Sequence, residues 1–166
     1  MADHRDLGGS VFVAELERAQ AEATTLRSPL SLLVIDIDHF KQINDQHGHA
    51  IGDRCLIGFS EQLRHVFAGL GELPARLGGE EFAVLLPGHR EAQATLRAEA
   101  FRVGLAAAAV VPELPELRIR VSIGVAEFTP ERHTGNDAFL IEADRALYRA
   151  KYEGRDRVCP ASMSRT

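Results

Sequence analysis

Residues 30–37 read LSLLVIDI, a short apolar stretch rich in branched side chains, and Asp38 follows directly after it. The dipeptide Ser28-Pro29 just before this stretch disfavours helix, because proline restricts the residue that precedes it. A run this short, with these side chains, is typical of a strand in the middle of a sheet. Asp36 is unusual in such a place, since a buried carboxylate is costly unless something pairs with it.

The chain on either side of this strand alternates between helical and strand patterns. Helical spacing of apolar residues predicts helices over 10–25, 40–48, 51–67 and 90–109, and a last helix that Asn136 or Asp137 caps and that runs through Lys151. Strand patterns cover 73–77, 82–86 and 117–125, and 157–158 begin a short closing strand. The intervening Gly78-Gly79-Glu80-Glu81 predicts a tight hairpin, because adjacent glycines supply the positive φ of such a turn.

This order of elements predicts the fold class. A mixed order with an antiparallel hairpin at its centre indicates an α+β protein and argues against a doubly wound parallel sheet. We therefore expect a central, mostly antiparallel five-stranded sheet flanked by helices. We expect one domain over residues 1–166, with its core at about 12–158 and terminal segments at 1–11 and 159–166.

Composition excludes several classes of protein. The 166 residues carry 24 acidic and 19 basic side chains, a net charge of −5, which argues against a general nucleic-acid binder. Cys55 and Cys159 lie outside any metal-type spacing and are expected to be buried thiols in a reducing cytosol. No apolar stretch is long enough to cross a membrane and the first residues do not resemble a signal peptide, so we expect a cytoplasmic location.

Acidic residues gather at two points of this predicted sheet. Asp36 and Asp38 lie at the end of the apolar strand, and Glu80 and Glu81 lie at the tip of the hairpin. Asp38 alone is most simply a helix cap. If the strand and the hairpin are neighbours, Asp36 and the two glutamates converge into a set of oxygen ligands that suits magnesium. The alternative for the glutamates is a solvated hairpin tip, and the residues alone leave both interpretations open.

Cationic and polar residues admit two interpretations each. Lys41 opens a helix next to Asp36, while Lys151 and Arg155 flank the end of the last helix. These cations either pair with helix C-termini or neutralise a metal-bound triphosphate. Asn44 and Asp53 have groups suited to reading a base edge. His47 and His49 flank a glycine but have no zinc-like partners elsewhere in the sequence, so no zinc site is predicted.

Four ordered motifs give the sequence a family resemblance. GGEEF at 78–82, preceded by Arg76-Leu77, resembles the signature loop of the GGDEF-domain diguanylate cyclases. LSLLVIDIDHFKQINDQHGHAIGD at 30–53 is similar to the first long motif of this family, and VSIGVA at 121–126 and ADRALYRAKYEGRDRV at 143–158 are similar to its C-terminal ones. The resemblance covers about 12–158 and implies the palm-like fold of nucleotidyl cyclases.

The resemblance implies a metal site and a role for each matching residue. Asp36, the backbone carbonyl of Ile37 and Glu80 would bind magnesium, Glu81 would help with a second ion, and manganese is an alternative metal. Glu80 would also activate the attacking 3′-hydroxyl. The implied substrate contacts are close backbone approach at Gly78 and Gly79, guanine recognition by Asn44 and Asp53, a nearby His49, and phosphate binding by Lys41, Lys151 and Arg155, with Lys41 also catalytic.

The implied activity joins two GTP molecules into cyclic di-GMP with release of pyrophosphate, two magnesium ions serving each GTP. One domain would hold one GTP, so the enzyme would act as a homodimer, with an upstream sensor or receiver domain as a further partner. A different class of function is a catalytically silent module that binds GTP or cyclic di-GMP and regulates a partner. Another is a different nucleotide cyclase on the same fold.

The sequence departs from the family pattern at three places. Gly69 and Glu72 stand near the arginine and aspartate positions of the Arg-x-x-Asp product-inhibition site, so we expect that site to be absent. Product would then inhibit elsewhere, for example in the substrate pocket. The segment MADHRDLGGSVF at 1–12 keeps only a trace of the usual DxLTGLxNR start. Asp156 replaces the asparagine often found in the final GRN.

Overall fold

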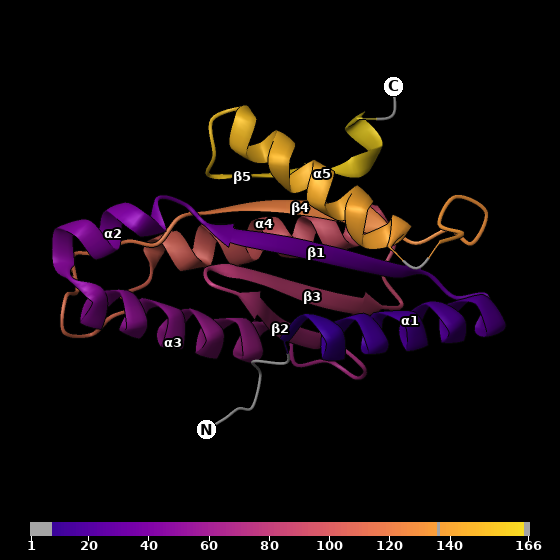
Figure 1. Ribbon diagram of the computed structural model, residues 1–166, viewed down its shortest axis with the longest axis horizontal. Helices are drawn as coiled ribbons and strands as arrows, with labels where there is room; N and C mark the ends of the chain where they lie inside the picture. Colours follow the sequence, from indigo (N-terminus) through magenta and orange to yellow (C-terminus); the bar gives the residue numbers. More distant parts are fainter. Residues whose placement is uncertain (1–7, 136, 165–166) are drawn as a thin grey trace.

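The apolar stretch forms strand β1 (Leu30–Ile37), which lies in the middle of a five-stranded sheet with every residue buried. The structure, a computed structural model, describes residues 8–135 and 137–164 (Figure 1). The strand order is β2-β3-β1-β4-β5, with β2 (Leu73–Gly78), β3 (Glu81–Pro87), β4 (Val121–Glu127) and β5 (Arg157–Pro160). All neighbours are antiparallel except β4 and β5. The predicted α+β class and mostly antiparallel sheet are therefore confirmed.

Helices cover both faces of this sheet. The core on one face combines residues of α2 (Phe40–His47), α3 (His49–Val66) and α4 (Glu91–Ala107) with the strands. The core on the other face uses α1 (Gly8–Leu26) and α5 (Ala138–Tyr152), and Figure 1 shows α5 crossing in front of β4 and β1. A short 3₁₀ helix, η1 (Ala161–Ser164), follows β5.

The alternation of side chains along β1 decides which face the acidic residue occupies. Leu33 and Ile35 belong to the core under α3 and α4, whereas Leu32 and Val34 belong to the core under α1 and α5. Because successive side chains of a strand point to opposite faces, Asp36 lies on the α5 face. This places its carboxylate within reach of groups on α5.

Two predicted element boundaries are wrong or unsupported. The predicted strand over 117–125 begins only at Val121 and continues to Glu127. The register of β1 and β4 ends at the Ile37–Val121 pair, so residues 117–120 have no strand opposite them, although Asp38 N–H donates to Arg120 O at 2.8 Å. Asp137 precedes α5 but makes no side-chain cap. Asn136, the other predicted cap, and most of the unusual N-terminal segment lie outside the described residues.

Both cysteines are free and buried, as predicted. Burial raises the pKa of each thiol, and for Cys159 the neighbouring Glu153 carboxylate adds to this effect. Within the ranges that the structure describes, no helix combines the length and the apolar character needed to cross a membrane.

Candidate active site

The predicted acidic residues meet where β1 ends and β3 begins. In the sheet register Asp36 lies opposite Glu81 on β3 and opposite Ser122 on β4. The Ile37 N–H donates to the backbone oxygen of Glu80 at 3.3 Å, which ties the hairpin tip to the end of β1. The expectation that strand and hairpin are neighbours is therefore confirmed, and both glutamates lie on the β3 side of Asp36.

Asp36 is buried in this position and is only partly neutralised. Its residue is 9% exposed, and its Oδ2 accepts a hydrogen bond from Lys151 Nζ of α5. Within the described chain its Oδ1 is buried and has no hydrogen-bond partner. Burial raises the pKa of Asp36, Lys151 lowers it, and the charges of Glu80 and Asp38 raise it further, so the net pKa lies above the ordinary value. An orphaned oxygen on such a carboxylate is suited to accept a cation.

Glu81 shares this acidic environment with a residue that the sequence analysis missed. Burial raises the pKa of Glu81, and the charges of Asp144, Asp36 and Glu80 act in the same direction against the opposing effect of Lys151. Asp144 precedes Lys151 by seven residues, so both lie on one side of α5. The seven-residue spacing from Lys151 could therefore have indicated from the sequence that Asp144 lies on the same side of the helix.

The loop between β2 and β3 keeps its backbone open. Gly79 has φ +53°, in the left-handed region that glycine enters most readily, and no atom lies within 4 Å of the position of a Cβ at Gly78 or Gly79. Arg76 Nε donates to the oxygen of Gly79 at 2.9 Å and braces the turn. The loop backbone is thus free to approach a ligand closely.

Asp38 does not act as the predicted helix cap. The residue before α2 is His39, which makes no side-chain cap. The Asp38 carboxylate instead accepts from Ser122 Oγ at 2.7 Å and from the Asp156 N–H at 2.9 Å. The cap interpretation fails because the strand geometry points Asp38 toward β4 and the C-terminal turn, two partners that lie far away in the sequence.

Lys41 is not brought to Asp36. Its side chain is 89% exposed and its Nζ lies 3.3 Å from Asp45 Oδ2, one turn further along α2. An exposed pair at this spacing contributes little to stability and releases either partner easily. Lys41 is therefore available to a ligand that enters beside α2, while Lys151 is the cation that contacts Asp36.

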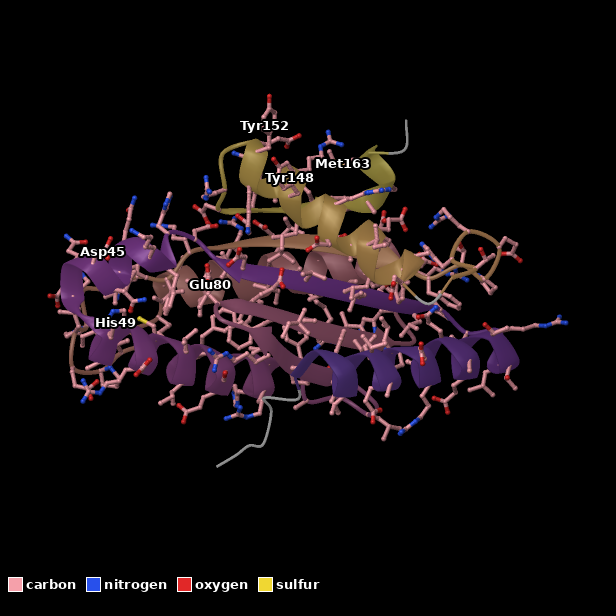
Figure 2. The ribbon with its side chains drawn as sticks, in the orientation of Figure 1. Asp45, His49, Glu80, Tyr148, Tyr152 and Met163 are labelled. Carbon is pink, nitrogen blue, oxygen red and sulfur yellow. The ribbon has the colours of Figure 1, made fainter. Side chains whose placement is uncertain are left out.

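The predicted base-reading residues lie where α2 and α3 meet. The amide of Asn44 lies so close to Gly52 that a Cβ there would come within 1.8 Å of Asn44 Oδ1. His49 and Asp53 are exposed and one turn apart on α3, so their side chains share a face. Figure 2 shows His49 beside the helices and Glu80 nearer the strands, with Tyr148 and Tyr152 of α5 directed away from both.

The donor chemistry suits magnesium, but the acids are not gathered into a finished metal site. Among residues 8–135 and 137–164, no group of three or more histidine, cysteine, aspartate or glutamate side chains is arranged to hold a metal ion. Within the described chain the Oδ1 of Asp36 has no hydrogen-bond partner and is open to a cation, and carboxylate and carbonyl oxygens are what magnesium prefers. The residues therefore fit the ion by chemistry, with Glu80 and Glu81 beside Asp36 on its β3 side.

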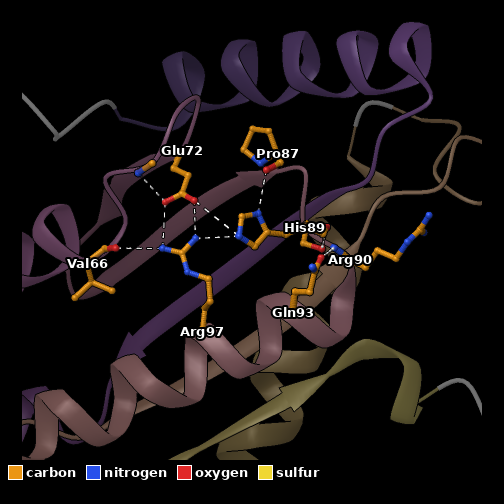
Figure 3. A network of polar contacts seen from close by, with 9 residues as sticks. Val66, Glu72, Pro87, His89, Arg90, Gln93 and Arg97 are labelled. Atoms are coloured by element: carbon orange, nitrogen blue, oxygen red, sulfur yellow. Dashed lines mark hydrogen bonds and ion pairs between the residues drawn. The ribbon is translucent and has the colours of Figure 1, made fainter.

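Glu72, at the aspartate position of the inhibition motif, is occupied by contacts within the protein (Figure 3). Its side chain is 7% exposed, and its oxygens accept from Arg97 Nη1 at 2.5 Å, Arg97 Nη2 at 3.2 Å and Gly69 N–H at 3.0 Å. Arg97 also lies over the ring of Phe67 and contacts Nε2 of His89. Burial works to raise the pKa of Glu72, but the bonds from Arg97 and Gly69 outweigh it, and the net pKa is lowered.

This lowered pKa predicts an acid-dependent contribution to stability. A carboxyl with a lower pKa in the native state stabilises the fold above its unfolded value, about 4.3, and loses that effect as pH falls through the native pKa. We expect Glu72→Gln to lower the free energy of unfolding by about 2 kcal/mol at pH 7, and the deficit to shrink below pH 4. Urea titrations at pH 7, 5, 4 and 3 measure this; a deficit independent of pH would contradict it.

Comparisons with known proteins identify the family of this chain. Residues 10–157 match the family model described as "Diguanylate cyclase, GGDEF domain". The chain is 42% identical over 148 residues to diguanylate cyclase DgcM of Escherichia coli, covering 87% of this chain and 34% of DgcM. Its structure resembles the GGDEF domain of DgcB from Caulobacter crescentus in complex with c-di-GMP, with a TM-score of 0.86, 33% identity and coverage of 97% and 95%.

A second solved structure, the active GGEEF domain of a diguanylate cyclase from Vibrio cholerae, gives a TM-score of 0.85 at 32% identity, with coverage of 95% of this chain and 98% of that one. The chain therefore belongs to the GGDEF-domain family of diguanylate cyclases. It spans 28–41% of the length of the curated relatives that it matches.

Proposed function

We propose that this domain is a diguanylate cyclase. The 3′-hydroxyl oxygen of one GTP attacks the α-phosphorus of the other, a new P–O bond forms, and the bond to pyrophosphate breaks. The same step in the opposite direction closes the ring, so two GTP yield one cyclic di-GMP, two pyrophosphates and two protons. Such transfers depend on positioning and charge neutralisation more than on covalent help from the protein.

One observation carries this proposal: the two glutamates of the signature loop lie beside Asp36 and its cationic partner. Asp36, Glu80 and Glu81 meet at the end of β1, with Lys151 in contact with Asp36. The active domain from Vibrio cholerae is named for a GGEEF loop, the same sequence that this chain has at 78–82. A regulatory module without activity has no need to keep three carboxylates together against their mutual repulsion.

The metal roles come from the family resemblance, and the positions of Asp36, Glu80 and Glu81 at the end of β1 support them. Asp36, the carbonyl of Ile37, Glu80 and Glu81 would hold two magnesium ions per GTP, with manganese as the alternative metal. When bound, these ions neutralise phosphate charge and polarise the phosphoryl oxygens. Glu80, in the hairpin loop beside Asp36, is the group that accepts the proton of the attacking hydroxyl.

The nucleotide roles are assigned to the surrounding helices and loop. We assign the guanine to Asn44 and Asp53 with His49 nearby, the loop backbone to Gly78 and Gly79, and the phosphates to Lys41, Lys151 and Arg155. Lys41 and Arg155 are both exposed, and Lys41 exchanges an easily broken pair for a phosphate. Charge-assisted contacts of this kind stabilise a triphosphate more strongly than neutral ones.

Gly52→Ala tests the assignment of guanine to Asn44 without replacing any of the residues proposed to bind the nucleotide. The new Cβ would meet Asn44 Oδ1 at 1.8 Å, and the amide must rotate away, which a flexible side chain does at little cost to the fold. We expect GTP affinity to fall about tenfold, as it would in Asn44→Ala, because a hydrogen bond to the base is lost. Calorimetric titration with GTP, and with inosine triphosphate as a base-edge control, measures the change; unaltered GTP affinity in Gly52→Ala would contradict the assignment.

The proposed enzyme works as a homodimer, because one domain holds one GTP and the reaction joins two. We also propose that an upstream sensor or receiver domain controls this pairing in the cell. The test incubates the chain with GTP and magnesium at several protein concentrations and measures cyclic di-GMP. Product per molecule of enzyme is expected to rise with concentration, since pairing follows mass action.

Two variants and one competitor complete this test. Glu80→Gln should form no product, whereas Glu116→Gln, the same change at an exposed residue of the loop before β4 to which no role is assigned, should match the unmodified chain. An excess of ATP should not compete with GTP. GTP binding without product from the unmodified chain at high concentration would show a silent module instead, and conversion of ATP would show a different nucleotide cyclase.

We further propose that this enzyme lacks product inhibition through the Arg-x-x-Asp site. Gly69 offers no guanidinium, and the Glu72 carboxylate is saturated by Arg97. Product would then compete in the substrate pocket through the same guanine contacts. Asn44→Ala and Asp53→Ala should each weaken cyclic di-GMP binding.

A further inference from the structure

The turn that joins α5 to β5 has an unusual backbone. Gly154, Arg155 and Asp156 have φ values of +124°, +67° and +50°, all in the region that side chains rarely enter. Two consecutive residues with side chains in this conformation cost free energy, and they persist only where the surroundings hold them. The turn lies directly after Lys151, the cation that contacts Asp36.

Asp156 is the residue that holds this turn to the rest of the fold. Its N–H donates to Asp38 Oδ2 at 2.9 Å, just beyond the end of β1. Its carboxylate accepts from Arg102 Nη1 of α4 at 2.7 Å and lies 3.5 Å from Arg120 Nη1, just before β4. One residue thus ties the turn to three separate segments: the end of β1, helix α4 and the residues just before β4.

Two partners of Asp156, Arg102 and Asp38, are also held by hydrogen bonds to other residues. Two hydrogen bonds to Glu99 orient the guanidinium of Arg102: its Nε donates at 2.9 Å and its Nη2 at 2.6 Å. These bonds also raise the pKa of the guanidinium. Asp38 is held by Ser122 Oγ at 2.7 Å. A preorganised partner on each side makes the position of Asp156 definite.

Arg155 is the residue whose position this arrangement controls. Its backbone lies between Lys151, which touches Asp36, and Asp156, which touches Asp38. Its own N–H donates to Ala150 O at 2.9 Å, but among the described residues its guanidinium has no hydrogen-bond or ion-pair partner. The backbone is anchored and the charged end is free, which is the arrangement expected of an anion-binding arm.

We propose that Asp156 is a positioning residue for phosphate binding: through Arg102 and Asp38 it holds the left-handed turn that places Arg155 beside the end of β1. This inference rests on the proposed use of GTP, since the phosphates of that nucleotide are what Arg155 would bind. It assigns a function to Asp156, one of the three places at which this chain departs from the family pattern, where asparagine is usual. Aspartate keeps the acceptor oxygen and adds a charge that selects Arg102 as its partner.

The experiment is a double-mutant cycle on GTP affinity. Asp156→Ala, Arg155→Ala and the double variant are titrated with magnesium and GTP by calorimetry. Asp156→Ala is expected to weaken GTP binding about tenfold, as loss of an outer partner of a binding residue does. In the Arg155→Ala background the same change should have no further effect, because the residue it positions is already gone.

Two further variants separate positioning from simple support of the fold. Asp156→Asn keeps an acceptor for Arg102 and tolerates the left-handed turn, so it should recover most of the affinity. Glu113→Ala, which removes the partner of exposed Arg54, serves as a matched loss of an ion pair and should leave GTP affinity unchanged. In kinetics, Asp156→Ala should raise KM more than it lowers kcat, since it affects binding.

The outcomes distinguish this inference from the proposed function. Additive effects of Asp156→Ala and Arg155→Ala, or a lower melting temperature with unchanged affinity, would overturn the positioning role. GTP binding without product would overturn the proposed cyclase activity. The double-mutant cycle on GTP affinity would still support or refute the role of Asp156. Failure of the unmodified chain to bind GTP would overturn both.

Discussion

Asparagine in place of Asp36 is expected to reduce cyclic di-GMP formation by on the order of a thousandfold, more than the 10–100-fold typical of outer-shell changes. The amide has the same size but lacks the charge, and its nitrogen cannot bind a metal ion as a carboxylate oxygen does. The substitution leaves one neutral amide oxygen in place of two charged ones, so the Asp36 oxygen that has no hydrogen-bond partner within the described chain no longer attracts a cation as strongly. Product formation from GTP and magnesium measures the effect, with Glu116→Gln as the control.

The same substitution is expected to leave the fold intact and to raise its stability at pH 7. The pKa of Asp36 is raised because burial and the neighbouring acids outweigh Lys151, so its charged form destabilises the native state. Removing the charge therefore raises the free energy of unfolding, a common trade of activity against stability. Lys151 is 32% exposed and reaches water when it loses its partner. An unfolded Asp36→Asn protein, or one with full activity, would contradict the assignment.

Gly124→Ala is expected to be the most destabilising single methyl addition described for this sheet. A Cβ at Gly124 of β4 would lie 2.2 Å from the backbone nitrogen of Leu147 and 2.3 Å from the backbone oxygen of Ala143, both in α5. Backbone atoms cannot rotate aside as a side chain does, so α5 must shift away from the strand. We expect a loss of about 3 kcal/mol, the upper part of the overpacking range, and a melting temperature lower by about 6–12 °C.

Gly104→Ala is the matched control for this substitution. Gly104 lies within α4, is exposed, and has no atom within 4 Å of its Cβ position. Alanine there should stabilise the protein by up to about 1 kcal/mol, because glycine is entropically unfavourable inside a helix. Thermal melts of both variants separate the crowding of α5 against β4 from any general effect of adding a methyl group. Equal melting temperatures would refute the close approach.

The sequence predicts the fold wherever one segment carries its own pattern. The buried run at 30–37 became β1, and the paired glycines became the turn of the central hairpin. The end of a strand is harder to predict, because residues 117–120 alternate like a strand but lie beyond the last residue of their neighbour. Pairing partners, and not local alternation, determine where β4 begins.

The site was predictable where chemistry and sheet register coincide, and much less so where partners come from distant segments. Asp36 and Glu81 follow from a strand beside a hairpin. Asp38 resembled a helix cap because its true partners, Ser122 and Asp156, are 84 and 118 residues away. Lys41 is close in sequence to Asp36 but turns toward its helix neighbour Asp45, and Lys151 takes the contact with the strand.

The central position of β1 also determines when the site can form during synthesis. This strand is made first of the five, yet both of its neighbours in the sheet are made later, and the cation that pairs with Asp36 follows 115 residues behind it. Long-range pairing of this kind is slow to assemble and leaves apolar strands uncovered meanwhile. On the ribosome, a growing chain therefore cannot pair Asp36 with Lys151, or Asp38 with Asp156, until α5 and the turn after it have emerged.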